Sequence, residues 1–194
     1  MPFASPASFA RPSISATSSR TPQSQAPAKS LFSRQSPEAD TVTVRVQSDD
    51  FDIASEIEVL TQGRTDIGAV VTFTGRVRGS AGGRDLVSMT LEHYPGMTEV
   101  ELEAVEADAH RRWPLQASLI IHRIGELRPG ANIVLVVTAS PHRHAAFQAA
   151  EFLMDYLKTR APFWKKEVFT DGASAWVDAR DSDDEALQRW QSIE

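Results

Sequence analysis

Several segments typical of β-strands follow one another at hairpin-length spacing in this chain, and two helix-like segments lie among them. The segments 67–78, 86–94, 118–125 and 132–140 are rich in β-branched and apolar residues. Short turns rich in Gly or containing Pro connect them in pairs. Strands joined by such short turns run antiparallel, because parallel strands need a much longer crossover. The pattern therefore predicts an α+β fold with a largely antiparallel sheet.

Local signals predict the helices and the remaining strands. A short helix over 52–62 begins at Asp52, and Thr98 with Glu101 forms a capping box for a helix over about 98–113. The second main helix runs from about Arg143 to Thr159 and ends before Pro162, which cannot continue it. We also expect strands at 41–47, 164–169 and 174–179, and a helix in the acidic tail 181–194.

Composition separates residues 1–40 from the rest of the chain. This segment is rich in Ser, Pro and Ala and contains no acidic residue before Glu38. Such a sequence cannot bury enough apolar surface to offset chain entropy, so we expect a disordered extension at 1–40 and one folded domain at 41–194. The extension is also typical of an organelle transit peptide, but a non-functional extension or an upstream start site would explain it equally well.

Charge and cysteine content exclude several classes of protein. The formal net charge is −6, whereas a general nucleic-acid binder usually has a basic surface. No apolar run approaches the length needed to span a bilayer, and we expect a cytoplasmic protein. Cysteine is absent, so the chain offers no disulfide, thiolate nucleophile, persulfide or cysteine-ligated metal cluster.

One short segment concentrates positive charge in this acidic domain. The first 40 residues hold four of the 20 Lys and Arg residues and two of the 26 Asp and Glu residues, which leaves 16 basic and 24 acidic residues in 41–194. Lys158 and Arg160 precede Pro162, and Lys165 and Lys166 follow it. Cations at a helix C-terminus complement the helix dipole, which explains the first pair. The second pair, on another element close by, indicates an anion-binding site, although solvated surface lysines remain an alternative.

Two further cationic groups are candidates for anion binding. Arg76 and Arg78 lie two apart in a predicted strand and should face the same side, next to the glycine-rich loop 79–83; a charged edge strand is the alternative. His142 and Arg143 open a helix, where backbone N–H groups favour anions. A zinc site at His142 and His144 has little support, because no acidic residue is near in sequence. We expect no metal.

Three of the five histidines do not belong to these groups. We interpret them as structural residues. They are His93, His110 and His122.

Five motifs in order make the chain similar to a known family. They are GAVVTFTGRVR (68–78), LEHYPGMTE (91–99), HRIGELRPG (122–130), the pair His142–Arg143, and YLKTRAPFWK (156–165). Over roughly residues 42–190 the chain resembles the large, catalytic subunit of molybdopterin synthase. The resemblance implies an α/β hammerhead-like fold with an additional small antiparallel β-sheet.

The resemblance also implies an activity and partners. The activity is sulfur transfer from a small ubiquitin-like carrier subunit, which holds a thiocarboxylate on its C-terminal Gly-Gly, to cyclic pyranopterin monophosphate. The product is the dithiolene of molybdopterin, in molybdenum cofactor biosynthesis, and no cofactor is needed. The family works as a homodimer at the centre of a heterotetramer. The apolar strands between Ile67 and Tyr94 offer surface for such pairing.

The resemblance assigns roles to individual residues. Lys158 matches the family's essential lysine and Lys165 its second catalytic lysine, with cations such as Arg160 as neighbours. Arg78 is expected to reach the pocket of the neighbouring subunit. Glu167, from its place beside Lys166 in the sequence, is expected to orient the lysines or contact substrate. The substrate-binding residues implied are Arg76, Val77, Arg78, His142, Arg143, Lys158, Lys165, Lys166 and Glu167.

Two other functions remain open at this point. The first is a non-enzymatic module that binds acidic ligands or single-stranded nucleic acid, with aromatic residues as a stacking platform. The second is a scaffold that has the fold without the activity. The cations of the first would be Arg76, Arg78, Lys165 and Lys166, and its aromatic residues Phe163 and Trp164.

Overall fold

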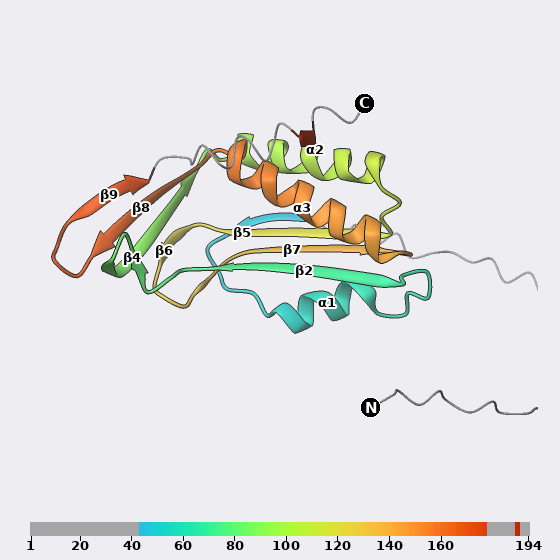
Figure 1. The fold of residues 1–194 in the computed structure, drawn as a ribbon, viewed down its shortest axis with the longest axis horizontal. Helices are drawn as coiled ribbons and strands as arrows, with labels where there is room; N and C mark the ends of the chain where they lie inside the picture. Colours follow the sequence, from blue (N-terminus) through green and yellow to red (C-terminus); the bar gives the residue numbers. More distant parts are fainter. Residues whose placement is uncertain (1–42, 178–188, 191–194) are drawn as a thin grey trace, which may run out of the picture. The chain divides into compact units, whose positions relative to one another are not determined.

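The computed structural model describes residues 43–177 and 189–190 (Figure 1). The predicted extension 1–40 and most of the predicted tail helix lie outside these residues. The elements in chain order are β1 (Val44–Gln47), α1 (Ile53–Thr61), β2 (Ala69–Arg76), β3 (Ser80–Ala81), β4 (Arg84–His93), α2 (Met97–Arg112), β5 (Ala117–Arg123), β6 (Gly125–Leu127), β7 (Asn132–Ser140), α3 (Arg143–Thr159), β8 (Phe163–Phe169) and β9 (Ser174–Val177).

The first sheet has the strand order β1-β5-β7-β2 and is covered by helices on both faces. Only the pairing of β1 with β5 is parallel. Helices α2 and α3 lie on one face of this sheet and α1 lies on the other (Figure 1). Alternate residues of β5 and β7 divide between the two faces: Ile120 and Val136 pack with α2 and α3, whereas Ile121 and Leu135 pack with α1. Both strands are therefore buried along almost their whole length.

A second, wholly antiparallel sheet lies at one end of the first (Figure 1). Its central strand β4 pairs with β8 along one edge and with β3 and β6 along the other, and β9 pairs with β8. The helices and the two largely antiparallel sheets confirm the predicted α+β class and its additional small sheet. Because β4 and β8 meet the C-terminal end of α3, this junction positions the candidate site described below.

Two helices begin and end where their local signals predict. Asp52 caps α1, since its Oδ1 accepts a hydrogen bond of 2.7 Å from the backbone N–H of Ser55. Helix α3 spans Arg143–Thr159, and the Arg160 N–H closes its last turn on the carbonyl of Tyr156 at 2.8 Å. Three residues after the helix ends, Pro162 precedes β8.

The capping box predicted at Thr98 and Glu101 is wrong. Helix α2 begins at Met97, and Glu99 Oε2 accepts a hydrogen bond of 2.7 Å from the backbone N–H of Gly96. Thr98 is fully buried, and its hydroxyl donates to the carbonyl of Tyr94 at 3.0 Å. The same three-residue spacing occurs twice in this segment, and burial of the threonine selects the earlier pair.

The glycine-rich segment 79–83 contains a hairpin where the sequence predicted a flexible loop. Gly82 and Gly83 both have positive φ angles, 57° and 77°, as a two-residue turn between β3 and β4 requires. Strand β2 ends at Arg76, two residues earlier than expected, after a register shift between Gly75 and Arg76. Arg78 therefore lies beyond the strand.

Candidate active site

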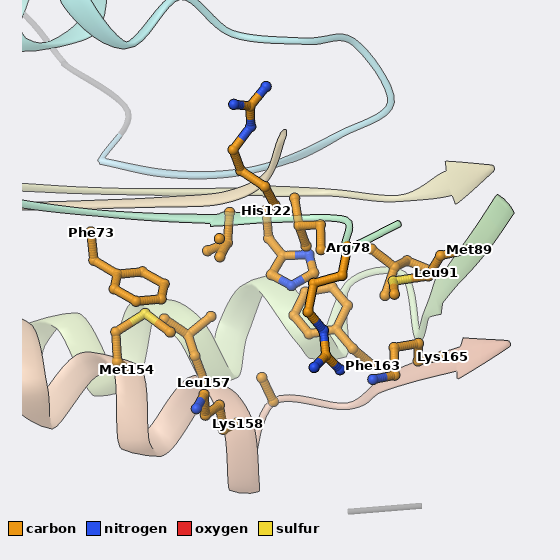
Figure 2. Close-up of a pocket in the computed structure, with 15 residues that line it drawn as sticks. Phe73, Arg78, Met89, Leu91, His122, Met154, Leu157, Lys158, Phe163 and Lys165 are labelled. Carbon is orange, nitrogen blue, oxygen red and sulfur yellow. The ribbon is translucent and has the colours of Figure 1, made fainter. Parts of the chain in front are cut away.

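A pocket of about 300 Å³ lies where the C-terminal end of α3 meets both sheets (Figure 2). Strands β2, β4, β5, β7 and β8 contribute side chains to it, together with α3. One part of its surface is apolar. The residues of this part include Phe73, Met89, Leu91, Met154 and Leu157.

Three cations approach this pocket from three separate elements. Lys158 belongs to the last turn of α3, Lys165 to β8, and Arg78 to the segment after β2. Figure 2 shows their charged ends on the same side of the pocket. The chain leaves α3, passes Pro162 and returns as β8, which brings Lys165 back toward Lys158. The predicted proximity of the two lysines on different elements is confirmed.

Glu167 supports Lys165 from the same face of β8. Its side chain is 8% exposed, and its Oε1 lies 3.7 Å from Lys165 Nζ. Residues two apart in a strand face the same side, so this buried carboxylate can fix the direction of the lysine. Of the two roles expected for Glu167, the geometry fits the orientation of a lysine.

Lys166 and Val77, both expected to bind substrate, do not line this pocket. Lys166 lies on the opposite face of β8, with Nζ 5.9 Å from the ring centroid of Trp176. Strand alternation separates it from Lys165. Val77 is 3% exposed and packs in an apolar cluster with Met89 and Leu91. Its backbone bonds with Gly130 and Ala131 hold the segment that presents Arg78.

Arg76 and Arg78 line the same pocket, as expected, although only Arg76 is in the strand. The guanidinium of Arg76 donates a hydrogen bond to the carbonyl of Gly130 and is thereby held by its own chain. Arg78 was expected to act in a neighbouring subunit. Within one chain it lines the pocket together with Lys158 and Lys165.

His142 and Arg143 lie at the other end of α3. They line a separate hollow with Gly68, Pro141 and His144. Fifteen residues separate Arg143 from Lys158, which corresponds to about 22 Å along the helix. His142, Arg143 and Arg78 were all expected to bind substrate, and within one chain Arg78 lines the pocket with Lys158 whereas His142 and Arg143 do not.

His122, interpreted from the sequence as structural, lines the pocket. Its Nδ1 is 2.9 Å from the carbonyl oxygen of Arg123, and its ring stacks on Phe163 with centroids 3.6 Å apart and 16° between the planes. Burial lowers the pKa of His122 to about 4, against the opposing effect of the Arg123 carbonyl, and His93 lowers it further. The only sequence signal for this residue is its place at the start of HRIGELRPG.

The described residues contain neither a metal-binding cluster nor a helix suited to cross a membrane. Across 43–177 and 189–190, no group of three or more His, Cys, Asp or Glu side chains is arranged to hold a metal ion. Within the same ranges, no helix combines the length and the apolar character that a membrane crossing requires.

The fold and the pocket define an α+β protein with a pocket bordered by lysine and arginine side chains. The family model described as MoaE protein matches residues 46–160, and the chain belongs to this family. The molybdopterin synthase catalytic subunit of Mesorhizobium japonicum is 59% identical over 151 residues, which are 77% of this chain and 94% of the relative.

Solved structures agree with this assignment. The molybdopterin biosynthesis MoaE protein from Burkholderia ambifaria MC40-6 is 51% identical with a TM-score of 0.66, over 78% of this chain and 99% of that one. Molybdopterin synthase from Staphylococcus aureus is 32% identical with a TM-score of 0.63, over 69% and 95% of the two chains.

Proposed function

We propose that this chain is the catalytic subunit of a molybdopterin synthase. It would transfer sulfur from the thiocarboxylate of a small carrier subunit to cyclic pyranopterin monophosphate, and so form the dithiolene of molybdopterin. The convergence of Lys158, Lys165 and Arg78 on one pocket supports this most directly, in a chain of net charge −6. The name catalytic subunit, given to the 59% identical relative, supports both the activity and the need for a partner.

The chemistry of both reactants matches a cationic pocket. The cyclic phosphate and the thiocarboxylate are anions, and the planar guanidinium of Arg78 is suited to bidentate contacts with phosphate oxygens. In each transfer a carbon–sulfur bond forms on the substrate and a carbon–oxygen bond of the substrate breaks. Hydrolysis of the bond between the sulfur and the acyl carbon then releases the carrier as its carboxylate. Lys158 and Lys165 would stabilise the negative charge on the departing oxygen, with Glu167 directing Lys165.

A homodimer would explain why His142 and Arg143 lie so far from Lys158. A separation of about 22 Å exceeds the reach of one small substrate, so the pair would serve the pocket of a second chain. We therefore assign Arg78, Lys158 and Lys165 to one chain of a composite site and His142 with Arg143 to the other.

The surface near α3 and β2 supports such pairing. Strand β2 is at the edge of the first sheet, and Val70 and Phe73 on it are each 39% exposed, while Phe147 on α3 is 62% exposed. Phe73 and Phe147 line one shallow hollow, and exposed apolar side chains that lie together in this way are typical of an interface. Two carriers on the dimer would complete a heterotetramer. Cytoplasmic location and the division into an extension and a domain stay predictions.

Reconstitution tests the activity. The purified chain is incubated with cyclic pyranopterin monophosphate and a carrier bearing a C-terminal thiocarboxylate, and the dithiolene product is measured. Product formation is expected with the thiocarboxylate and none with the carboxylate form of the same carrier. Absence of product with both forms would contradict the proposal.

Binding of single-stranded nucleic acid is the second candidate, because one surface favours it. Trp164 and Trp176, 49% and 53% exposed, share the outer face of β8 and β9 with Lys166 and offer rings on which bases could stack. Phe163 cannot contribute, since it stacks on His122 inside the pocket. A single cation, Lys166, can neutralise only a small part of the charge of a polyanion. We therefore expect weaker binding to an oligonucleotide than to the carrier.

A further inference from the structure

We propose that His122 is the hydrogen-bond acceptor of the active-site pocket, and that its Nε2 receives an N–H or O–H group of the bound pterin. This inference rests on the proposed function and adds a residue to it. It assigns the pocket a ligand that is anionic at one end and presents a hydrogen-bond donor at another.

The backbone determines which nitrogen of His122 can accept. Nδ1 lies 2.9 Å from the carbonyl oxygen of Arg123, and two lone pairs cannot face each other at that distance. Nδ1 therefore carries the proton, and in the neutral ring Nε2 is left with a free lone pair. Stacking on Phe163 at 3.6 Å holds the plane of the ring.

The acceptor atom is open to the pocket. Within the described part of the chain, Arg45 Nε is the only fully buried side-chain nitrogen or oxygen without a hydrogen-bond partner. His122 Nε2 makes no hydrogen bond to another described residue either, so it must reach open space. The side chain is almost entirely enclosed by protein, and the space it lines is the pocket. Figure 2 shows the ring between Phe73 and Arg78.

No other described side chain that lines the pocket offers a comparable acceptor. Its charged side chains are lysines and arginines, which only donate. Met89 and Met154 offer thioether sulfurs, which accept weakly. Cations can hold the phosphate of a pterin, but its ring N–H and side-chain O–H groups would then be buried without partners, which is costly. Nε2 of His122 supplies the missing partner.

The surroundings keep the imidazole in its accepting form. Four cations line the same pocket as His122: Arg76 and Arg78 at and after the end of β2, Lys158 on α3 and Lys165 on β8. His93 on β4 lowers the pKa of the His122 ring. Burial acts in the same direction and lowers its pKa to about 4. At neutral pH the ring thus accepts a hydrogen bond and does not act as an acid.

Three substitutions at His122 distinguish its role as a hydrogen-bond acceptor from its role in packing. In His122→Gln the amide oxygen can occupy the position of Nε2. In His122→Asn the amide reaches only the position of Nδ1, which preserves the contact with the Arg123 carbonyl and removes the acceptor. His122→Phe keeps the stacking and removes both nitrogens. His110→Asn is the control, because it makes the same substitution at a histidine that bonds to Ser118 outside the pocket.

The readouts are kcat/KM in the reconstituted reaction and the thermal midpoint of each variant. We expect His122→Asn and His122→Phe to lose about tenfold or more in kcat/KM, and His122→Gln to recover most of it. His110→Asn should keep kcat/KM even if its midpoint falls. Equal kcat/KM in all three His122 variants, whether lowered or unchanged, would overturn the assignment.

If the wild-type chain forms no product, the proposed function is refuted. A second measurement then tests the role of His122 without depending on activity. Two-bond ¹H–¹⁵N spectra of histidine-labelled protein report which ring nitrogen is protonated. An unprotonated Nε2 that shifts when cyclic pyranopterin monophosphate is added supports the assignment. A protonated Nε2, or one unaffected by the pterin, overturns it.

Discussion

Lys165 and Lys166 are neighbours in sequence but lie on opposite faces of β8, and their substitutions should differ accordingly. Lys158→Ala and Lys165→Ala should lower the rate of dithiolene formation at least about 100-fold, because each removes a charge from the reacting groups. Lys166→Ala should retain most of the activity, because that side chain contacts Trp176 instead. The measurement is product formed per unit time with thiocarboxylated carrier.

Thermal midpoints and carrier binding serve as controls for these variants. Both should stay close to the wild-type values, since Lys158 and Lys165 border the pocket and not the core. An equal loss at Lys165 and Lys166 would mean that charge density in the segment matters and position does not.

His122 should also make stability depend on pH. In the unfolded chain an imidazole takes up a proton near pH 6.5, whereas the folded ring stays neutral down to about pH 4. The unfolded state therefore binds more protons in this interval, and the free energy of unfolding should fall by up to about 3 kcal/mol as the pH drops through it. Urea midpoints at neutral pH and near pH 5 measure the effect.

The matched comparison is His122→Phe, which should flatten this pH dependence. Asp66 does not contribute to the pH dependence in this interval, because its hydrogen bond with Arg64 lowers its pKa to about 2. The same slope in the wild type and His122→Phe would refute the role of His122.

The contact between Gly68 and the start of α3 sets the position of His142 and Arg143. A Cβ added at Gly68 would lie 2.2 Å from the carbonyl oxygen of Pro141, and backbone cannot easily give way. We expect Gly68→Ala to lower stability by about 1–3 kcal/mol. Gly79→Ala is the control, since its Cβ would meet nothing within 4 Å. Calorimetric midpoints should differ between the two variants, and equal midpoints would contradict this reading.

Elements whose signals are local could be predicted from the sequence. Helix α3 matches its expected bounds because helix periodicity, Pro162 and the strand pattern before it all agree. The start of α2 could not be predicted as well, because Gly96–Glu99 and Thr98–Glu101 have the same spacing and only tertiary burial distinguishes them. Exposure along α3 could not be predicted either, because Phe147 is 62% exposed although Ala150 and Leu157, which follow it at helical spacing, are buried.

The candidate site depended on contacts between distant elements. Proximity of Lys158 and Lys165 followed from a single break in the chain, and the structure bears it out. The place of His122 required knowing that the end of β5 meets β8, which no local pattern gives. The separation of Arg143 from Arg78 could not be predicted either, because it depends on how α3 packs on the first sheet.

The assembled molecule should be open to complementation between chains. Lys158→Ala and Arg143→Ala chains, each inactive alone, should regain activity when mixed, because a mixed dimer contains one pocket with all its residues. Lys158→Ala mixed with Arg78→Ala is the control and should stay inactive, since both residues line the pocket of the same chain. Product formation after subunit exchange is measured. Rescue in the control mixture, or none in the first, would contradict the composite site.

The length of α3 also has a consequence for a cell that makes both a normal and a defective copy of this chain. If the two ends of the helix serve two different pockets, a chain altered only at Lys158 leaves one working pocket in every mixed pair. A chain altered at both Lys158 and Arg143 leaves no working pocket in a mixed pair. Its own pocket lacks Lys158, and the pocket of its normal partner lacks Arg143. Such a double variant would therefore lower the activity of a cell that also makes the normal chain more than either single variant does.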